Sequence, residues 1–287
     1  MSAQKSVSVQ DLASRIDVSE AIIHSMLLDI ESHYRKFPIR RTHKRPRWIN
    51  APEPALKIIQ KKLLQRVLYK VNPHPDAHGF YPGKSILSNA QPHCNKNWVI
   101  SFDVKDFFPN TTQEMVRKSL PHEKLRIDPQ LISQLCCLGG ALPQGAPTSP
   151  HLANLAFYEC DLKLKKFALS HSLSYTRYAD DMTFSGNELP DGITEIVCKT
   201  LLKSNYLLAE KKTKLMGRNT QQKVTGLHVN ERVLLPRSLR RKIRAIKHDI
   251  KTNGMTKAIS KSTLVKSESE LQGFFALQSM IEKAQSN

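Results

Sequence analysis

Tyr178-Ala179-Asp180-Asp181 joins two strand-like runs and places two adjacent carboxylates between them. Residues 173–176 before it and residues 182–184 after it alternate apolar and polar side chains. Such alternation is typical of half-buried strands. The sequence therefore predicts a β-hairpin whose turn carries Asp180 and Asp181.

A second strand-like run, residues 98–106, contains another acidic pair, Asp103 and Asp106. Its alternation puts Asp103 on the face opposite the large apolar side chains of the run. If this strand lies beside the predicted hairpin, Asp103 comes next to Asp180 and Asp181. The fold would then gather three carboxylates at one point.

Carboxylates this close repel one another unless cations neutralise them. Mg²⁺ prefers hard oxygen ligands and accepts substrate phosphates to complete its shell. The cluster therefore predicts two-metal phosphoryl or nucleotidyl transfer. An Asp-Asp pair taken alone is more often a solvated turn, but this pair is one of two in a strongly basic chain.

The 287 residues contain 44 Lys+Arg against 25 Asp+Glu, which gives a formal net charge of +19. Residues 35–70 hold twelve basic residues and one acidic residue, residues 199–251 hold fifteen and three, and the remainder sums to −4. This distribution predicts two basic patches that grip a nucleic-acid backbone across a mildly acidic centre. The alternative is that both segments are merely solvated helix faces.

Composition excludes several classes of protein. An apolar fraction of 40% supports a folded core. The five cysteines form no Cys-x-x-Cys pair, so we expect reduced thiols rather than a disulfide framework. The chain opens with no apolar signal core, and no apolar run approaches the length of a membrane span. We therefore expect a cytoplasmic protein with no membrane partner.

Helical periodicity recurs along the chain. Helices are expected within residues 7–31 (two short ones), after Pro54 (with a cationic outer face), and over residues 86–94, 112–120 and 129–138. Residues 38–54 are basic and proline-rich and are expected to be extended. The helix pair at 7–31 could be a DNA-reading helix-turn-helix, but its second helix carries almost no basic side chain, which favours a packing element.

Three segments, in this order, resemble the motifs of reverse transcriptases, and specifically of the bacterial retron type. Residues 102–108 are similar to the first catalytic motif, residues 142–150 to the loop that positions template and nucleotide, and residues 178–181 to the second catalytic motif. Within the loop, Gly145 would let the backbone approach a ligand closely. The resemblance extends over residues 10–250.

Further elements point to the retron type. Asn89-Ala90-Gln91-Pro92-His93 resembles the Asn-Ala-x-x-His element of retron enzymes, and Val224-Thr225-Gly226 resembles their Val-Thr-Gly element. Lys212-Thr213-Lys214 is similar to the lysine motif that follows the second catalytic hairpin, and residues 226–230 are similar to the primer-grip strand.

The resemblance implies an α+β fold, a right-hand polymerase with an antiparallel-sheet palm, helical fingers and a small helical thumb. We expect an N-terminal helical element over residues 1–35, fingers and palm over residues 36–230, and a thumb over residues 231–287. The basic run that begins at Arg237 suits a thumb lying along a duplex minor groove.

The resemblance also implies roles for the site. Asp103, Asp180 and Asp181 would be the catalytic carboxylates and, with the Val104 carbonyl, would hold two Mg²⁺ ions. Phe108 would be a steric gate against a ribose 2′-OH, with plain core packing as its alternative.

Other residues would contact the nucleotide. Gln144 would support it, and Arg47, with Lys44, would hold its triphosphate, although residues 40–47 offer six basic candidates. Lys212 would act as general acid to pyrophosphate or as a simple phosphate contact.

RNA and primer contacts are expected at Asn89, His93, Gly226, Arg240, Arg241 and Arg244. Asn89 and His93, four residues apart, would share one helix face. A paired amide and imidazole suit recognition of a folded RNA, and a helix-stabilising core pair is the open alternative.

A retron enzyme would use deoxynucleoside triphosphates to copy a cognate structured noncoding RNA. It would prime from an RNA 2′-OH and yield a branched RNA–DNA (msDNA), with host RNase H removing the template. In this family the product commonly joins the enzyme and a separately encoded effector in antiphage defence. The alternatives are a group II-like or other bacterial reverse transcriptase, or a noncatalytic RNA-binding scaffold that holds an effector silent.

Overall fold

The computed structural model describes the backbone of residues 2–41 and 44–286 and the side chains of residues 9–40 and 46–285. The helices are α1 (Ser2–Ile16), α2 (Glu20–Leu28), α3 (Pro54–Arg66), α4 (Ile86–Ala90), α5 (Phe107–Asn110), α6 (Gln113–Ser119), α7 (His122–Leu125), α8 (Pro129–Cys136), α9 (Ser149–Ala156), α10 (Tyr158–Ser170), α11 (Ile193–Lys203), α12 (Arg237–Asn253), α13 (Met255–Lys261) and α14 (Glu268–Ser286). The strands are β1 (Tyr34–Arg41), β2 (Lys44–Pro52), β3 (Trp98–Asp103), β4 (Ser174–Tyr178), β5 (Asp181–Gly186), β6 (Lys214–Gly217), β7 (Lys223–Val224) and β8 (Leu227–His228). Short 3₁₀ helices cover Glu31–His33, Leu68–Lys70, Gln91–His93 and Glu210–Lys212.

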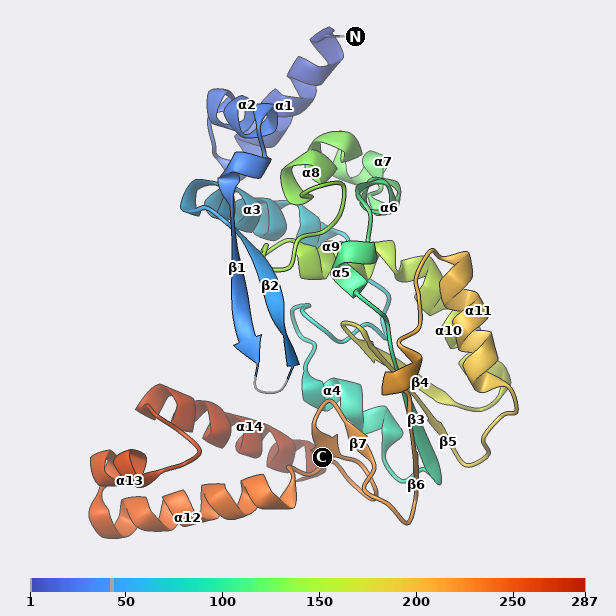
Figure 1. Ribbon diagram of the computed structural model, residues 1–287, viewed down its shortest axis with the longest axis vertical. Helices are drawn as coiled ribbons and strands as arrows, with labels where there is room; N and C mark the ends of the chain where they lie inside the picture. The colour runs from blue at the N-terminus through green and yellow to red at the C-terminus, as the bar shows by residue number, and fades with distance from the viewer. Residues whose placement is uncertain (1, 42–43, 287) are drawn as a thin grey trace.

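The centre of the molecule is a four-stranded antiparallel sheet in the order β4-β5-β3-β6 (Figure 1). The predicted hairpin is β4 and β5, and the predicted second strand is β3, which lies directly beside β5. The α+β class with an antiparallel sheet is therefore confirmed.

Side chains that alternate along β3 belong to two separate clusters of buried residues. Ile100 and Phe102 point into the larger cluster, which includes residues from α1, α3, α8 and α10. Val99 points the other way, into a smaller cluster with residues of α4, β8 and α12. Strand β3 is thus buried on both faces, and Asp103 lies at its end.

The N-terminal helices are packing elements. Leu12, Ile16 and Ile23 are fully buried and belong to the larger cluster together with Leu56 and Leu63 of α3. This burial of the apolar stripes supports the packing interpretation of residues 7–31.

Residues 38–41 and 44–52 are extended, as expected, but they belong to a feature that the sequence did not predict. β1 and β2 pair as a long antiparallel hairpin that runs from the upper helices toward the lower lobe (Figure 1). The Lys36 ammonium lies 5.2 Å from the ring centre of Trp48 across the hairpin. The prolines and basic residues of these strands hid the pairing, because they weaken the usual strand signals.

The lower lobe consists of α12, α13 and α14 (Figure 1). Ile246, Val265 and Leu271 form its own apolar cluster. Ile243 of α12 and Ile281 of α14 instead join the cluster on the far side of the central sheet. The lobe is therefore seated on the sheet through α4, β7 and β8, and the two proposed boundaries between the three domains stay a prediction.

Two expected helices are shorter than predicted. The helix after Pro54 ends at Arg66 and continues as a 3₁₀ turn, and the helix expected over residues 86–94 ends at Ala90. Pro92 lies inside the following 3₁₀ turn, Gln91–His93, because its ring and missing N–H do not allow an α-helix to continue.

The cysteines in the described part of the chain are free thiols, as predicted. Across residues 2–41 and 44–286, no helix combines the length and apolar character needed to cross a bilayer.

Candidate active site

The turn between β4 and β5 presents the paired carboxylates. Ala179 adopts the left-handed conformation, with φ +57°, and β5 begins at Asp181. The register of the sheet sets Asp103 opposite Asp181. The Val104 amide donates a hydrogen bond to the Asp180 carbonyl at 2.9 Å. The two predicted catalytic segments are thus joined at the backbone.

The electrostatics of the three carboxylates follow from this crowding. Loss of solvent around its carboxyl, together with the charges of Asp180 and Asp103, raises the pKa of Asp181 to about 6. Burial, and then the Asp103 charge, raises the pKa of Asp180 as well. Lys212 Nζ donates to Asp103 Oδ1 at 2.6 Å, and this hydrogen bond raises the pKa of the lysine. The site therefore holds excess negative charge that a single ammonium only partly offsets.

These residues fit a divalent cation in ligand type and in charge, since hard carboxylate oxygens and uncompensated repulsion both favour one. No group of three or more His, Cys, Asp or Glu side chains in the described chain is already arranged as a metal cage. The side chains would have to converge on the ion, and the assignment of two Mg²⁺ ions stays a proposal.

A cleft of about 890 Å³ opens beside Asp180. Six of the predicted site residues line it: Arg47, Val104, Phe108, Gln144, Asp180 and Lys212. Segments from β2, the end of β3, the 142–150 loop, the hairpin turn and the 3₁₀ turn before β6 thus meet around one space.

Gln144 and Arg47 are linked directly. Arg47 Nε donates to Gln144 Oε1 at 2.7 Å, and the Asn50 amide donates to the Gln144 carbonyl at 2.8 Å. A Cβ added at Gly145, which has φ +132°, would lie 2.8 Å from the Asn50 carbonyl oxygen. The glycine therefore allows close approach to strand β2, and approach of the loop backbone to a ligand stays a prediction.

Phe108 packs against the core and also faces the cleft, and its role as a steric gate stays a prediction. Its ring is partly buried and packs against the larger apolar cluster, with the ring of Phe107 5.6 Å away between centroids. It also lines the cleft. The side chain of Lys44 lies outside the described residues, so its proposed contact with the triphosphate stays a prediction.

Asn89 and His93 lie inside the protein, each with 0% of its surface exposed. His93 Nδ1 and Nε2 lie 2.7 and 2.8 Å from the hydroxyls of Ser185 and Thr176, on β5 and β4. The Asn89 carbonyl accepts a hydrogen bond from Thr176 Oγ1 at 3.2 Å. Because buried side chains cannot touch RNA, the expectation of a direct RNA contact on one shared helix face is corrected. His93 braces the catalytic hairpin through its imidazole and Asn89 through its backbone carbonyl, while the Asn89 carboxamide makes no hydrogen bond within the described residues.

The two retron-type elements pack against each other. Thr225 and Gly226 both have positive φ and form the turn between β7 and β8. Thr225 Oγ1 donates to the Ile86 carbonyl at 3.1 Å, and Val224 shares an apolar cluster with Leu87 of α4. Gly226 therefore serves this turn, and its proposed contact with primer stays a prediction.

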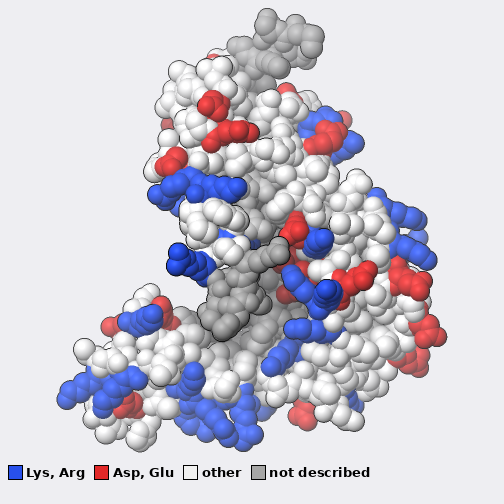
Figure 2. Space-filling model, in the orientation of Figure 1, with Lys and Arg blue, Asp and Glu red and all other residues white. Residues whose placement is uncertain are grey.

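Arg240, Arg241 and Arg244 are exposed on α12 and do not line the central cleft. Arg240 and Arg244 line a second cavity of about 430 Å³ between α12 and α14, together with Arg232 and Lys247. Figure 2 shows Lys and Arg gathered over this lower lobe. These arginines thus lie apart from the carboxylates, whereas Lys212 of the same basic segment contacts Asp103, and the two-patch grip on nucleic acid stays a prediction.

Sequence reasoning missed two aromatic residues that line the cleft, Trp48 and Phe80. Both are about half exposed, at 52% and 50%. Phe80 also has φ +59°, a conformation that bulky residues rarely adopt. The local signal for Phe80 is the turn-rich run of residues 78–85, which contains Gly79, Pro82 and Gly83.

A cleft floored by carboxylates on an antiparallel sheet, with a basic helical lobe beside it, defines a nucleic-acid polymerase of the nucleotidyl-transfer class. A family model described as reverse transcriptase (RNA-dependent DNA polymerase) matches residues 35–229. The retron Ec86 reverse transcriptase of Escherichia coli is 32% identical over 251 residues, which cover 85% of this chain and 78% of that protein. The chain therefore belongs to the retron-type reverse transcriptases, which are RNA-directed DNA polymerases.

The match to a second relative covers a smaller share of that relative's length. The retron Mx65 reverse transcriptase of Myxococcus xanthus is 30% identical over 264 residues, covering 83% of this chain and 62% of that protein. The chain thus spans less than two thirds of that relative. The solved structure of apo telomerase from Candida tropicalis, truncated from its C-terminal domain, aligns with a TM-score of 0.46 at 11% identity, over 76% of this chain and 61% of that one. The family assignment does not depend on that distant likeness.

Proposed function

We propose that this chain copies RNA into DNA by metal-dependent nucleotidyl transfer at Asp103, Asp180 and Asp181. The observation that carries the proposal is the pairing of β3 with β5, which sets Asp103 opposite Asp181 beside the cleft. Two Mg²⁺ ions held by these carboxylates and the Val104 carbonyl would lower the pKa of the attacking hydroxyl and stabilise the charge on phosphorus and pyrophosphate.

The other residues of the cleft bind and orient. Lys212 would leave Asp103 to contact the pyrophosphate end of the nucleotide, where its ammonium can donate either a hydrogen bond or a proton. Arg47, held by Gln144, would contact the triphosphate. Phe108 would lie against the sugar, where a ring leaves no space for a 2′-OH. Lys44 remains a second candidate for the triphosphate.

The template and primer are proposed from the family likeness. The enzyme would copy a cognate structured noncoding RNA, prime from a guanosine 2′-OH of that RNA, and yield a branched RNA–DNA (msDNA). The exposed arginines of α12 support contact with the backbone of such a duplex. A separately encoded effector, removal of the template by host RNase H, a cytoplasmic location and a role in antiphage defence rest on the likeness alone.

Two alternatives remain in view. A group II-like or other bacterial reverse transcriptase would share the cleft but would make no 2′-linked product on a neighbouring noncoding RNA. A noncatalytic RNA-binding scaffold would not need all three carboxylates, and the chain retains them. An inverted-repeat noncoding RNA in the DNA flanking the gene would favour the retron enzyme over both.

The test of the polymerase site is the pair Asp180→Asn with Asp181→Asn. Primer extension on an RNA template should fall about a thousandfold or more, while RNA affinity should change less than about threefold, because backbone contacts lie on the basic lobe. Asp191→Asn, an exposed aspartate on the loop before α11, is the matched control for loss of charge. Extension at the wild-type rate by the double variant would refute the site assignment.

A further inference from the structure

Arg177 carries a charged group that lies wholly inside the protein, one residue before the tyrosine of the catalytic turn. Its Nε and Nη2 donate to Asp161 Oδ1 and Oδ2 of α10, at 2.9 and 2.6 Å. The rings of Phe157 and Phe107 flank the guanidinium, with centroids 4.5 and 5.8 Å away. Asp161 is also fully buried, so this ion pair is sealed from solvent.

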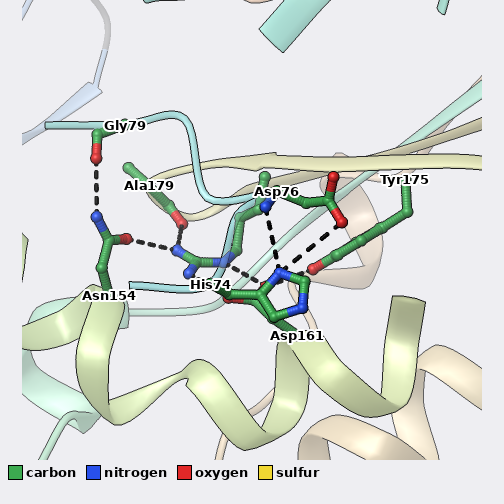
Figure 3. A network of polar contacts seen from close by, with 8 residues as sticks. His74, Asp76, Gly79, Asn154, Asp161, Tyr175 and Ala179 are labelled. Carbon is green, nitrogen blue, oxygen red and sulfur yellow. Dashed lines mark hydrogen bonds and ion pairs between the residues drawn. The ribbon is translucent and has the colours of Figure 1, made fainter. Parts of the chain in front are cut away.

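The remaining nitrogen of the guanidinium faces the turn. Arg177 Nη1 donates to the Ala179 carbonyl and to Asn154 Oδ1, at 2.9 Å each. Asn154 Nδ2 in turn donates to the Gly79 carbonyl at 2.8 Å. Figure 3 shows Asn154 between the Gly79 loop and the turn, with Asp161 and Tyr175 on the other side of the network.

The Gly79 loop presses directly on the turn. A Cβ added at Gly79 would lie 2.7 Å from the Ala179 nitrogen, so only glycine allows this approach. The loop is also paired to β4, since the His78 amide donates to the Arg177 carbonyl at 2.7 Å. The Gly79 loop and Asn154 of α9 therefore converge on the turn, the loop at Ala179 and Asn154 at the Arg177 guanidinium.

This convergence fixes the backbone on both sides of Asp180. The Ala179 carbonyl, which belongs to the peptide before Asp180, is held by Arg177. The Asp180 carbonyl, which belongs to the peptide after it, is held by the Val104 amide at 2.9 Å. Ala179 is a non-glycine residue in the left-handed conformation, which persists only where its surroundings determine it.

A contribution to the stability of the fold does not by itself explain the buried Arg177–Asp161 ion pair. A buried ion pair contributes little net stability compared with well-packed apolar side chains, but it can select one arrangement of the atoms it contacts. Here the arrangement selected is the orientation of the peptide that enters Asp180.

We propose that Arg177 is a positioning residue of the active site: its Nη1, oriented by Asn154, holds the Ala179 carbonyl and so sets the direction in which the Asp180 carboxylate points. The inference rests on the proposed function, because it takes Asp180 as a metal ligand. Asp161 and the two flanking rings hold the guanidinium in place, and Asn154 orients Nη1 toward the Ala179 carbonyl.

The test uses Asn154 rather than Arg177, since removal of the arginine would leave the Asp161 charge buried without a partner. Asn154→Leu has a similar shape and removes the oxygen that orients Nη1. The matched control is Tyr175→Phe, which removes one hydrogen bond to Asp161, from a hydroxyl 2.6 Å away, on the side of the network remote from the turn. Both positions are 1% exposed.

Three quantities are measured for each variant: kcat and KM for a deoxynucleotide in primer extension, the affinity of the enzyme–RNA complex for Mn²⁺ by electron paramagnetic resonance, and the folded fraction by urea unfolding. In Asn154→Leu, kcat per folded molecule should fall about 10- to 100-fold, Mn²⁺ affinity should weaken by about threefold or more, and KM should change little. Tyr175→Phe should keep both kcat and Mn²⁺ affinity within about threefold of wild type.

Equal losses in the two variants would overturn the proposal, as would an unchanged kcat per folded molecule in Asn154→Leu. Failure of Asn154→Leu to fold would also overturn it, because the residue would then serve the fold as a whole. Asp180→Asn, measured in the same assays, distinguishes failure of the positioning role from failure of the proposed function. If Asp180→Asn is active, the proposed function fails; if it is inactive while Asn154→Leu behaves as wild type, the positioning role alone fails.

Discussion

Lys212 donates a hydrogen bond from Nζ to Asp103 Oδ1 across 2.6 Å, so an ammonium neutralises the carboxylate that faces Asp181. The lysine side chain is 62% exposed, whereas that of Asp103 is 13% exposed. The lysine can therefore swing into solvent or toward a nucleotide, while the aspartate stays in place. A divalent cation and this ammonium would compete for the same oxygen.

Replacement of Lys212 by Met should consequently have opposite effects on binding and on rate. Mn²⁺ affinity of the nucleotide-free enzyme should increase by about three- to tenfold, because the competing charge is gone. The kcat for nucleotide addition should decrease by about tenfold to a hundredfold, because a donor to the departing pyrophosphate is lost. Lys211→Met, which removes the neighbouring exposed lysine, is the control. Unchanged Mn²⁺ affinity would show that the hydrogen bond from Lys212 to Asp103 does not compete with metal binding.

The position of the carboxylates was predictable because the signals are local. Strand alternation around residues 98–103 and 173–184 specifies which strands form, and adjacency of β3 and β5 then brings Asp103 to Asp181. The sequence left a core pair open for Asn89 and His93 but could not identify the partners of His93, because Ser185 and Thr176 lie more than eighty residues along the chain. The burial of Arg177 was not predicted for the same reason. A charged residue in an alternating strand is expected to face solvent, and the packing of α10 against the sheet buries it.

Asp181 should make the metal-free protein less stable as the pH rises. Its folded pKa of about 6 exceeds the ordinary value of 3.8, so the folded state binds the proton more tightly than the unfolded state. The resulting stability is fully present below pH 3.8 and is lost as the pH rises through 6. Asp181→Asn should therefore raise the free energy of unfolding at pH 8, by about 1 kcal/mol after allowance for the exposure of the residue.

Thermal melts of the two proteins without metal, at pH 8 and at pH 4, measure this effect. The variant should melt about 2 °C above wild type at pH 8 and no higher at pH 4. Added Mg²⁺ should stabilise wild type more than the variant, since binding to the folded state adds stability. Asp191→Asn should show neither difference. A melting temperature for Asp181→Asn below that of wild type at pH 8 would contradict the electrostatic account.

Phe108 should govern the choice of sugar. Phe108→Ala opens space in the cleft, so incorporation of ribonucleotides relative to deoxynucleotides should rise by about tenfold or more. Phe108→Tyr keeps the ring and should keep the discrimination. Competition between the two nucleotide types in primer extension gives the ratio. If discrimination stays the same in the alanine variant, Phe108 is a packing residue only.

The arginines of α12 should contribute affinity without selectivity. Replacement of Arg240, Arg241 and Arg244 by Gln should weaken binding to any RNA–DNA duplex and reduce the slope of log K against log salt by about one for each lost phosphate contact. A triple replacement of exposed lysines elsewhere, at positions 124, 163 and 166, should leave the slope unchanged. A loss confined to one RNA sequence would instead indicate base recognition by the lobe.

His93 should support polymerisation and initiation alike. Its imidazole hydrogen-bonds two buried hydroxyls beneath the catalytic hairpin, and burial, with the nearby His78 charge, lowers its pKa to about 3. His93→Ala removes a hydrogen-bond partner from both Ser185 and Thr176 and opens a cavity, so the free energy of unfolding at pH 7 should fall by about 3 kcal/mol.

Because the unfolded imidazole protonates near pH 6.5 and the folded one only near pH 3, His93 contributes stability above pH 6.5 that is lost on acidification. The alanine variant should therefore lose stability less steeply than wild type between pH 6.5 and pH 4.5. Extension of an annealed DNA primer and primer-independent initiation on the cognate RNA should decline together, in proportion to the damage to the hairpin. Asn97→Ala, at an exposed position before β3, should affect neither assay. Full extension with selective loss of initiation in His93→Ala would mean that this buried element does read RNA, through the exposed backbone and side chains that it holds in place.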